Sequence, residues 1–167
     1  SFDADSPLEP VAVAAVPSAD QVAAACAAQV GEIEQVPPAV SALKVGGQPA
    51  YKLARAGKPP QLEPRKVTIY WLHIHRYEWP ELDFEMACGR GTYVRSVIRD
   101  IGTTLTTGGC LTALTRVAIG PFHVNDAWTV ERLQETPGAD DYLIPLESAR
   151  ETLARRPIPI PSPPATE

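Results

Sequence analysis

The sequence lacks a cysteine framework, a long apolar run and, over its first 35 residues, any lysine or arginine. Its 3 cysteines, Cys26, Cys88 and Cys110, share no spacing typical of metal ligands, which argues against a disulfide scaffold or a zinc site. The apolar stretches fall well short of the roughly 20 residues that a membrane-spanning helix needs. No basic segment followed by an apolar core marks a secretory signal. These absences predict a cytoplasmic protein with reduced thiols, no bound metal and no membrane contact.

What is present suits a single folded domain. The chain has 167 residues, of which 44% are hydrophobic, so it can bury a core. Its 18 prolines cluster in "VPPAV", in "GKPPQLEPR" and near the C-terminus. Because proline disrupts helix interiors, these clusters predict extended segments and turns.

Charge is distributed unevenly along the chain. The net charge of −5 argues at first against a nucleic-acid partner. However, residues 36–66 carry a local charge of +5 and residues 88–116 a local charge of +3, between acidic segments. If these two basic stretches share one face of the fold, that face can bind phosphates. The alternative is an ordinary solvated surface.

The residue pattern predicts a mixed α+β domain with a largely antiparallel sheet flanked by helices. Alternation in "LDFEMAC" places Leu82, Phe84, Met86 and Cys88 on one buried face of a strand. The expected elements are a strand at 11–16, a helix within 18–31, a turn at 46–47, a helix at 49–56, a strand pair around 79–80, a helix after Gly91 and a short helix at 129–134.

The stretch "CGRGTYVRSVIRD" places Arg95 at the start of a helix. The positive end of the helix dipole disfavours a cation there, so we expect a carboxylate or a phosphate to compensate its charge. Arg99 lies one turn further on and projects to the same side. A glycine turn with an arginine on the surface is the alternative.

The stretch "VSALKVGGQPAYKLARAGK" places Tyr51 among four basic residues. Aromatic side chains between basic ones suit stacking on a nucleotide base while phosphates are held nearby. Alone, such a tyrosine is more often a packing residue.

Together, "GEIEQVPPAVSALKVGGQPAYKLARAG", "EPRKVTIY", "CGRGTYVRSVIRDIG" and "LTALTRVAIGPF" resemble bacterial TruB-type tRNA pseudouridine synthases in order and spacing. The resemblance covers roughly residues 1–147. It implies a pseudouridine synthase catalytic-domain fold over 1–147, incomplete at its N-terminus, followed by a proline-rich, disordered tail at 148–167.

By this resemblance, the protein isomerises a uridine in the TΨC loop of tRNA, as a monomer, without cofactor or metal. The target base flips out of the loop and an aspartate attacks the nucleotide. Tyr51 corresponds to the tyrosine that stacks on the base and helps to remove a proton, and Arg95 to the arginine that orients the aspartate. Tyr93 and Leu114 correspond to pocket-lining positions. Charge alone suggests four further phosphate contacts, at Lys44, Arg65, Arg90 and Arg116.

The sequence departs from the family pattern in one important respect. The family nucleophile lies in a Gly-x-x-Asp-Pro segment near the N-terminus, and this chain contains no Asp-Pro pair. We therefore expect the chain to begin partway through the catalytic domain and to be inactive alone. Two alternatives remain open: a catalytically inactive tRNA-binding module, and a decayed fragment without function.

Overall fold

The computed structural model describes residues 10–138, 140 and 142–155. Contacts within the chain divide it into a larger unit that ends at Ala113 and a smaller unit that begins at Leu114. Among the described residues, the larger unit contains a three-stranded sheet, a two-stranded hairpin and three helices, and the smaller unit contains a two-stranded hairpin, a 3-10 turn and two helices.

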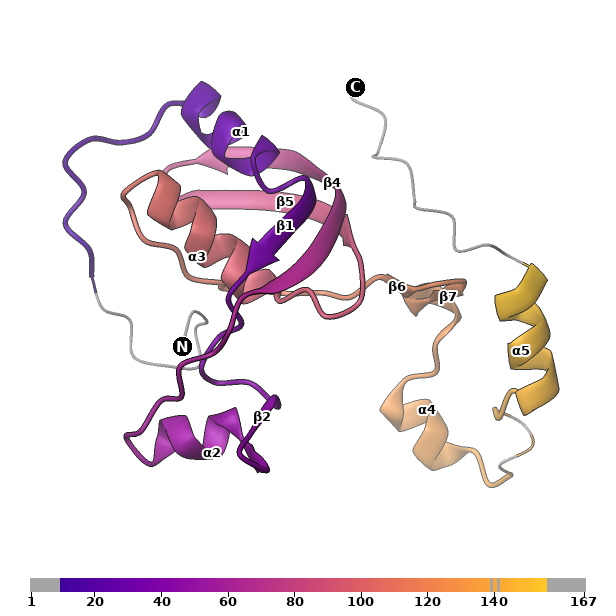
Figure 1. The fold of residues 1–167 in the computed structure, drawn as a ribbon. Coiled ribbons are helices and arrows are strands. Elements are labelled where there is room, and N and C mark those ends of the chain that lie inside the picture. Colours follow the sequence, from indigo (N-terminus) through magenta and orange to yellow (C-terminus); the bar gives the residue numbers. More distant parts are fainter. Residues whose placement is uncertain (1–9, 139, 141, 156–167) are drawn as a thin grey trace. The chain divides into compact units, whose positions relative to one another are not determined.

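The sheet of the larger unit is antiparallel, with strand order β1-β4-β5 (Figure 1). The central strand β4 (Arg65–Glu78) pairs with β1 (Gly31–Gln35) through its first residues and with β5 (Glu81–Cys88) through the rest. The β4–β5 hairpin turns at Trp79-Pro80, which confirms the predicted strand pair. We did not predict the pairing of β1.

The core joins the sheet to two helices, α1 (Ala19–Ala27) and α3 (Val94–Thr104), which Figure 1 shows beside the strands. Ser18 caps α1 and forms a capping box with Gln21. The fully buried side chains at the centre include Val22, Ile69 and Val97. Burial of each such aliphatic side chain contributes about 1.5–3 kcal/mol to folding.

A two-stranded hairpin and a short helix follow β1. Strand β2 (Lys44–Val45) pairs with β3 (Gln48–Pro49). Gly46 and Gly47 form the turn with φ angles of 57° and 83°, a left-handed conformation that glycine adopts without strain. Helix α2 (Ala50–Arg55) begins directly after β3. The predicted turn and helix are both confirmed.

The smaller unit has no buried side chain among its described residues. It contains the pair β6 (Ala118–Ile119) and β7 (Phe122–His123), a 3-10 turn η1 (Val124–Asp126), α4 (Val130–Glu135) and α5 (Leu146–Arg155). The Arg132 guanidinium stacks on the Trp128 ring at 3.6 Å from its centroid. Helix α4 confirms the short helix predicted at 129–134.

Three expectations differ from the structure. Residues 11–16 form no strand, and Val11 and Val16 are exposed, because β1 and not this segment pairs with β4. Cys88 is exposed although the alternation predicts burial, since the pairing register shifts between Ile69 and Trp71 beside it. Residues 148–155 belong to α5, whereas we expected them to be disordered. The rest of the expected tail lies outside the described residues, and the division at 147 stays a prediction.

Candidate active site

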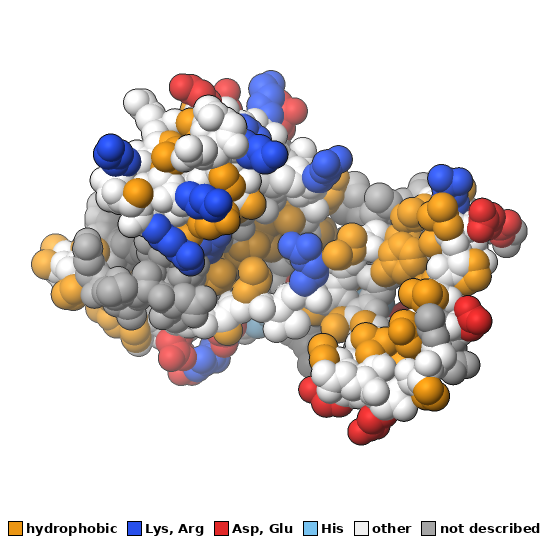
Figure 2. Space-filling view, turned by 90° about the horizontal axis from the view of Figure 1, so that it is seen from below, with side chains coloured by type: hydrophobic (Ala, Val, Ile, Leu, Met, Phe, Trp, Pro, Cys, Tyr) orange, Lys and Arg blue, Asp and Glu red, His pale blue; other side chains and the backbone are white. Residues whose placement is uncertain are grey.

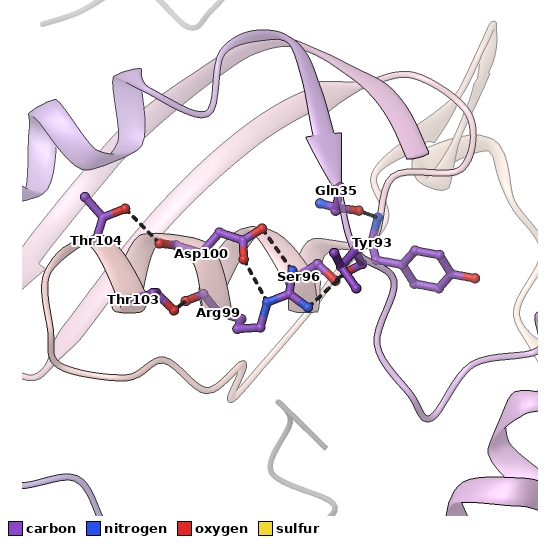
Figure 3. Close-up of polar contacts among 8 residues, drawn as sticks. Gln35, Tyr93, Ser96, Arg99, Asp100, Thr103 and Thr104 are labelled. Atoms are coloured by element: carbon purple, nitrogen blue, oxygen red, sulfur yellow. Dashed lines mark hydrogen bonds and ion pairs between the residues drawn. The ribbon is translucent and has the colours of Figure 1, made fainter. Parts of the chain in front are cut away.

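The start of helix α3 is held by a residue of the sheet. Tyr93 is the N-cap of α3 and makes no side-chain capping bond of its own. Its backbone N–H donates to Gln35 Oε1 at 2.8 Å (Figure 3). Gln35 is the last residue of β1 and only 1% exposed. An acceptor from a neighbouring strand therefore satisfies an N–H group that the helix itself leaves unpaired.

The next residue of the chain binds α3 again. The Val36 carbonyl accepts hydrogen bonds from Ser96 Oγ and from Arg99 Nη1, each at 2.9 Å. The Arg99 guanidinium also donates to Asp100 through Nε at 2.7 Å and Nη2 at 3.1 Å, as Figure 3 shows. Arg99 therefore fastens the segment after β1 to the helix.

Arg95 contacts the same segment further along the chain. It is half-buried, and its Nη2 donates to the Val40 carbonyl at 3.0 Å. A carbonyl oxygen with its partial negative charge partly offsets a cation near a helix N-terminus. The predicted pairing of Arg95 with a carboxylate stays a prediction.

Tyr51 is attached to the residues that follow Val40. Its backbone N–H donates to the Ser41 carbonyl at 3.0 Å, and the Ala50 N–H donates to the Leu43 carbonyl at 2.6 Å. These bonds fix the start of α2. The Tyr51 side chain is half-buried, with the Arg55 guanidinium 5.6 Å from its ring centroid. The structure thus links the two predicted catalytic residues through one short segment.

The other predicted site residues fall into two groups. Tyr93 is half-buried beside Arg95, and the basic residues Lys44, Arg65 and Arg90 are exposed on the same unit. In Figure 2 the larger unit, at the upper left, carries Lys and Arg side chains across its face and Asp and Glu side chains towards its rim. Leu114, which is 61% exposed, and Arg116 belong to the smaller unit, and their part in the site stays a prediction.

A groove of about 510 Å³ lies on this unit between the segments 36–39 and 60–64. Prolines and aliphatic side chains line most of it, and Arg99 lies at its wall. None of Tyr51, Tyr93 and Arg95 lines it, so it is not the base pocket that we expected from the sequence.

Residue-by-residue reasoning missed Gln35. Gln35 lies two residues after Ile33, which packs against the core. Because side chains two residues apart on a strand point to the same face, Gln35 is expected on the buried face. A buried polar side chain on a strand needs a hydrogen-bond partner, and that requirement was the available signal. Among the described residues, no cluster of His, Cys, Asp and Glu suits a metal ion, and no helix is long and apolar enough to cross a membrane.

Comparison with known families decides the relationship. Residues 3–94 match the family model described as "TruB family pseudouridylate synthase (N terminal domain)". The chain belongs to the TruB family. Residues 95–150 match the TruB-family model "tRNA pseudouridylate synthase B C-terminal domain". The two matches meet at the first turn of α3, whereas contacts place all of α3 in the larger unit.

Curated TruB relatives are named tRNA pseudouridine synthase B. The chain is 43% identical to that of Clostridium kluyveri over 119 residues, which cover 71% of the chain and 41% of the relative. It is 44% identical to that of Syntrophotalea carbinolica, over 70% of the chain and 38% of the relative. It is 45% identical to that of Mycobacterium sp. strain KMS, over 71% of the chain and 41% of the relative. The chain therefore spans about two fifths of these relatives.

A solved structure supports the fold. A chain in the crystal structure of a Cbf5-Nop10-Gar1 complex matches with a TM-score of 0.58 and 25% identity, over 74% of this chain and 32% of that one. The family resemblance and the mixed α+β fold predicted from the sequence are both confirmed.

Proposed function

We propose that the protein isomerises a uridine of the TΨC loop of tRNA to pseudouridine. The observation that supports this most directly is the joint attachment of Arg95 and Tyr51 to the segment Val40–Leu43. The segment brings a guanidinium and an aromatic ring of the predicted site onto one scaffold. The names of the TruB relatives agree with this chemistry.

In the proposed reaction, the uridine flips out of the loop and stacks on the Tyr51 ring. Unstacking costs a few kcal/mol, which the protein recovers through base stacking and phosphate contacts. A carboxylate oriented by Arg95 attacks the nucleotide, the glycosidic bond breaks, the uracil turns, and a carbon–carbon bond forms as the carboxylate is released. Tyr51 then helps to remove the proton from the new bonding carbon. On the family resemblance alone, Tyr93 and Leu114 are proposed as residues that line the base pocket.

The nucleophile is not assigned to any residue of this chain, because the 167 residues contain no Asp-Pro pair. We propose Lys44, Arg65, Arg90 and Arg116 as phosphate contacts, since all four are exposed. The proposal requires no cofactor and no metal, and it assigns a cytoplasmic monomer.

The test is a pseudouridylation assay on an unmodified TΨC stem-loop, with and without a supplied segment that carries Gly-x-x-Asp-Pro. We expect stem-loop binding by the chain alone and pseudouridine only when the segment is added. Arg95→Met should abolish product formation in the complemented reaction. If neither binding nor product is observed in any arm, the proposed function is wrong.

The absence of an Asp-Pro pair also favours a second candidate, a tRNA-binding module without catalysis. This candidate predicts salt-sensitive binding of the stem-loop and no product even with the added segment. A decayed fragment predicts instead that the chain shows no cooperative thermal unfolding.

A further inference from the structure

We infer that Gln35 is a positioning residue for this site: its side-chain oxygen fixes the first turn of α3, and thereby the placement of Tyr93 and Arg95. The inference rests on the proposed function for its link to RNA. The hydrogen-bond arrangement on which it depends belongs to the larger unit alone.

The helices of this chain differ in how their N-termini are capped. Ser18 caps α1 by accepting from the Gln21 N–H, and Thr129 caps α4 by accepting from the Arg132 N–H. The N-cap residue of α3, Tyr93, makes no such side-chain hydrogen bond. A cap contributes about 1 kcal/mol and fixes the entry of the chain into the helix. For α3, Gln35 supplies an acceptor to the N-cap residue from another element, through the 2.8 Å bond to the Tyr93 N–H.

Gln35 is well placed to transmit the position of the sheet to the helix. Its backbone pairs in register with Arg65 of β4, and Ile33, two residues earlier in β1, pairs with Val67, which is buried in the sheet. The Val36 carbonyl then binds α3 at Ser96 and Arg99. The end of β1 therefore contacts α3 at residues 93, 96 and 99, which lie along one side of the helix. Arg95 lies between the first two of these contacts.

Stability alone does not account for a glutamine at this position. Gln35 Nε2 is buried and has no hydrogen-bond partner among the residues that the structure describes. An unpaired buried donor costs about 1–3 kcal/mol, which an apolar side chain of similar shape would avoid. What glutamine provides and methionine does not is the oxygen that accepts from Tyr93. The geometry thus assigns the positioning of the first turn of α3 to the Gln35 Oε1 atom.

The decisive comparison uses Gln35→Glu, which retains an acceptor oxygen, and Gln35→Met, which removes it at similar volume. Gln29→Met is the matched control, because Gln29 is a second buried glutamine and follows α1. All three are first checked for cooperative unfolding. The first readout is hydrogen exchange of the Tyr93 amide, measured by NMR without RNA, so it does not depend on the proposed function.

We expect the Tyr93 amide of the unaltered chain to be protected. Gln35→Met should speed its exchange about tenfold or more, and Gln35→Glu by less than about threefold. Affinity for the TΨC stem-loop should fall about tenfold in Gln35→Met only. In a double-mutant cycle, the losses from Gln35→Met and Arg95→Lys should be non-additive, because both disturb the same helix turn. Gln29→Met should leave exchange at Tyr93 and affinity unchanged.

The inference is overturned if Tyr93 exchanges rapidly in the unaltered chain, if Gln35→Glu loses as much protection as Gln35→Met, or if Gln29→Met has the same effect. Should Gln35→Met not fold, two measurements still decide: rapid Tyr93 exchange in the unaltered chain, or a speeding of that exchange by more than about threefold in Gln35→Glu, overturns the inference. If hydrogen exchange of the Tyr93 amide changes as expected but the chain does not bind the TΨC stem-loop, the capping role of Gln35 stands and the proposed function fails.

Discussion

Arg95 and Tyr51 are bound to consecutive carbonyl groups of one segment. Arg95 Nη2 donates to the Val40 carbonyl and the Tyr51 N–H donates to the Ser41 carbonyl, both at 3.0 Å. The two residues come from different helices, α3 and α2. Because both bonds end on neighbouring peptide groups, a displacement of this segment moves both side chains, and the site behaves as one unit.

The stacking role of Tyr51 predicts a difference between two substitutions. Tyr51→Phe keeps the ring and should change stem-loop affinity by less than about threefold, whereas Tyr51→Leu should weaken it about tenfold. Fluorescence anisotropy with a labelled TΨC stem-loop at fixed salt measures both. Equal losses in the two variants would show that the hydroxyl, and not the ring face, binds the RNA.

The exposed basic residues of the larger unit predict a salt effect. Three single variants replace Lys44, Arg65 or Arg90 by glutamine. Each should reduce the slope of log affinity against log salt concentration by about 1, because each variant loses one phosphate contact. Titration of RNA binding over a range of KCl concentrations gives the slopes.

Arg76→Gln is the control for this series. The Arg76 guanidinium is bound to Asp83, Glu81 and Glu78 at 2.7–3.0 Å, at the far end of the β4–β5 hairpin. The hydrogen bonds that Arg76 donates to Asp83 and then to Glu81 raise the pKa of its guanidinium above the ordinary value. We expect an unchanged slope, since this charge is already neutralised. A drop as large as that of Arg65→Gln would mean that phosphates are not bound where we place them.

The backbone of Gly108 and Gly109 passes close to Gly102 of α3, and this close approach predicts an effect on stability. A Cβ atom added at Gly102 would overlap the carbonyl group of Gly108 and lie 2.6 Å from the Gly109 nitrogen. Both neighbours are backbone, so they cannot move aside without shifting the turn. Gly102→Ala should therefore lower the free energy of unfolding by about 2 kcal/mol or more, measured by urea denaturation.

Gly89→Ala is the matched control, because a Cβ there meets its nearest atoms at 3.5 Å, an ordinary contact distance. The free energy of unfolding should change by less than about 1 kcal/mol. A similar loss in both variants would point to a general intolerance of alanine and not to the close approach at Gly102.

Cys26 predicts a pH dependence of stability. Burial in the core raises the pKa of its thiol from 9.0 to about 11. Below pH 9 the thiol is protonated in both states and contributes nothing to the pH dependence. As the pH rises from 9 towards 11, the unfolded chain loses this proton first, so stability falls until the folded thiol also ionises.

Comparison with Cys26→Ala isolates this effect from other titrating groups. The stability advantage of the unaltered chain over Cys26→Ala should shrink between pH 9 and 11 in urea titrations. A thiol reagent near neutral pH should label exposed Cys88 readily and Cys26 only after unfolding. A constant advantage across this pH range would contradict the raised pKa.

Local patterns in the sequence were enough to predict several elements. Helix α1 follows from the Ser18 cap and the alanines of the segment behind it, and the β2–β3 hairpin from Gly46 and Gly47, because each involves bonds within a few residues. The alternation of β5 predicts its buried face up to Met86. Tyr51 and Arg95 were recognised through their motifs, and their catalytic roles stay predictions.

Other features depend on residues far apart in the chain. Gln35 binds Tyr93 across 58 positions, and Val40 binds Arg95 across 55. The same holds for the pairing of β1 with β4, the missing strand at 11–16 and the exposure of Cys88. A short window of sequence carries propensity and period, but it does not say which distant acceptor a buried N–H or guanidinium will meet. Packing of α3 against the end of β1 settles that, because only there is the N-terminal N–H of α3 brought to the oxygen of Gln35.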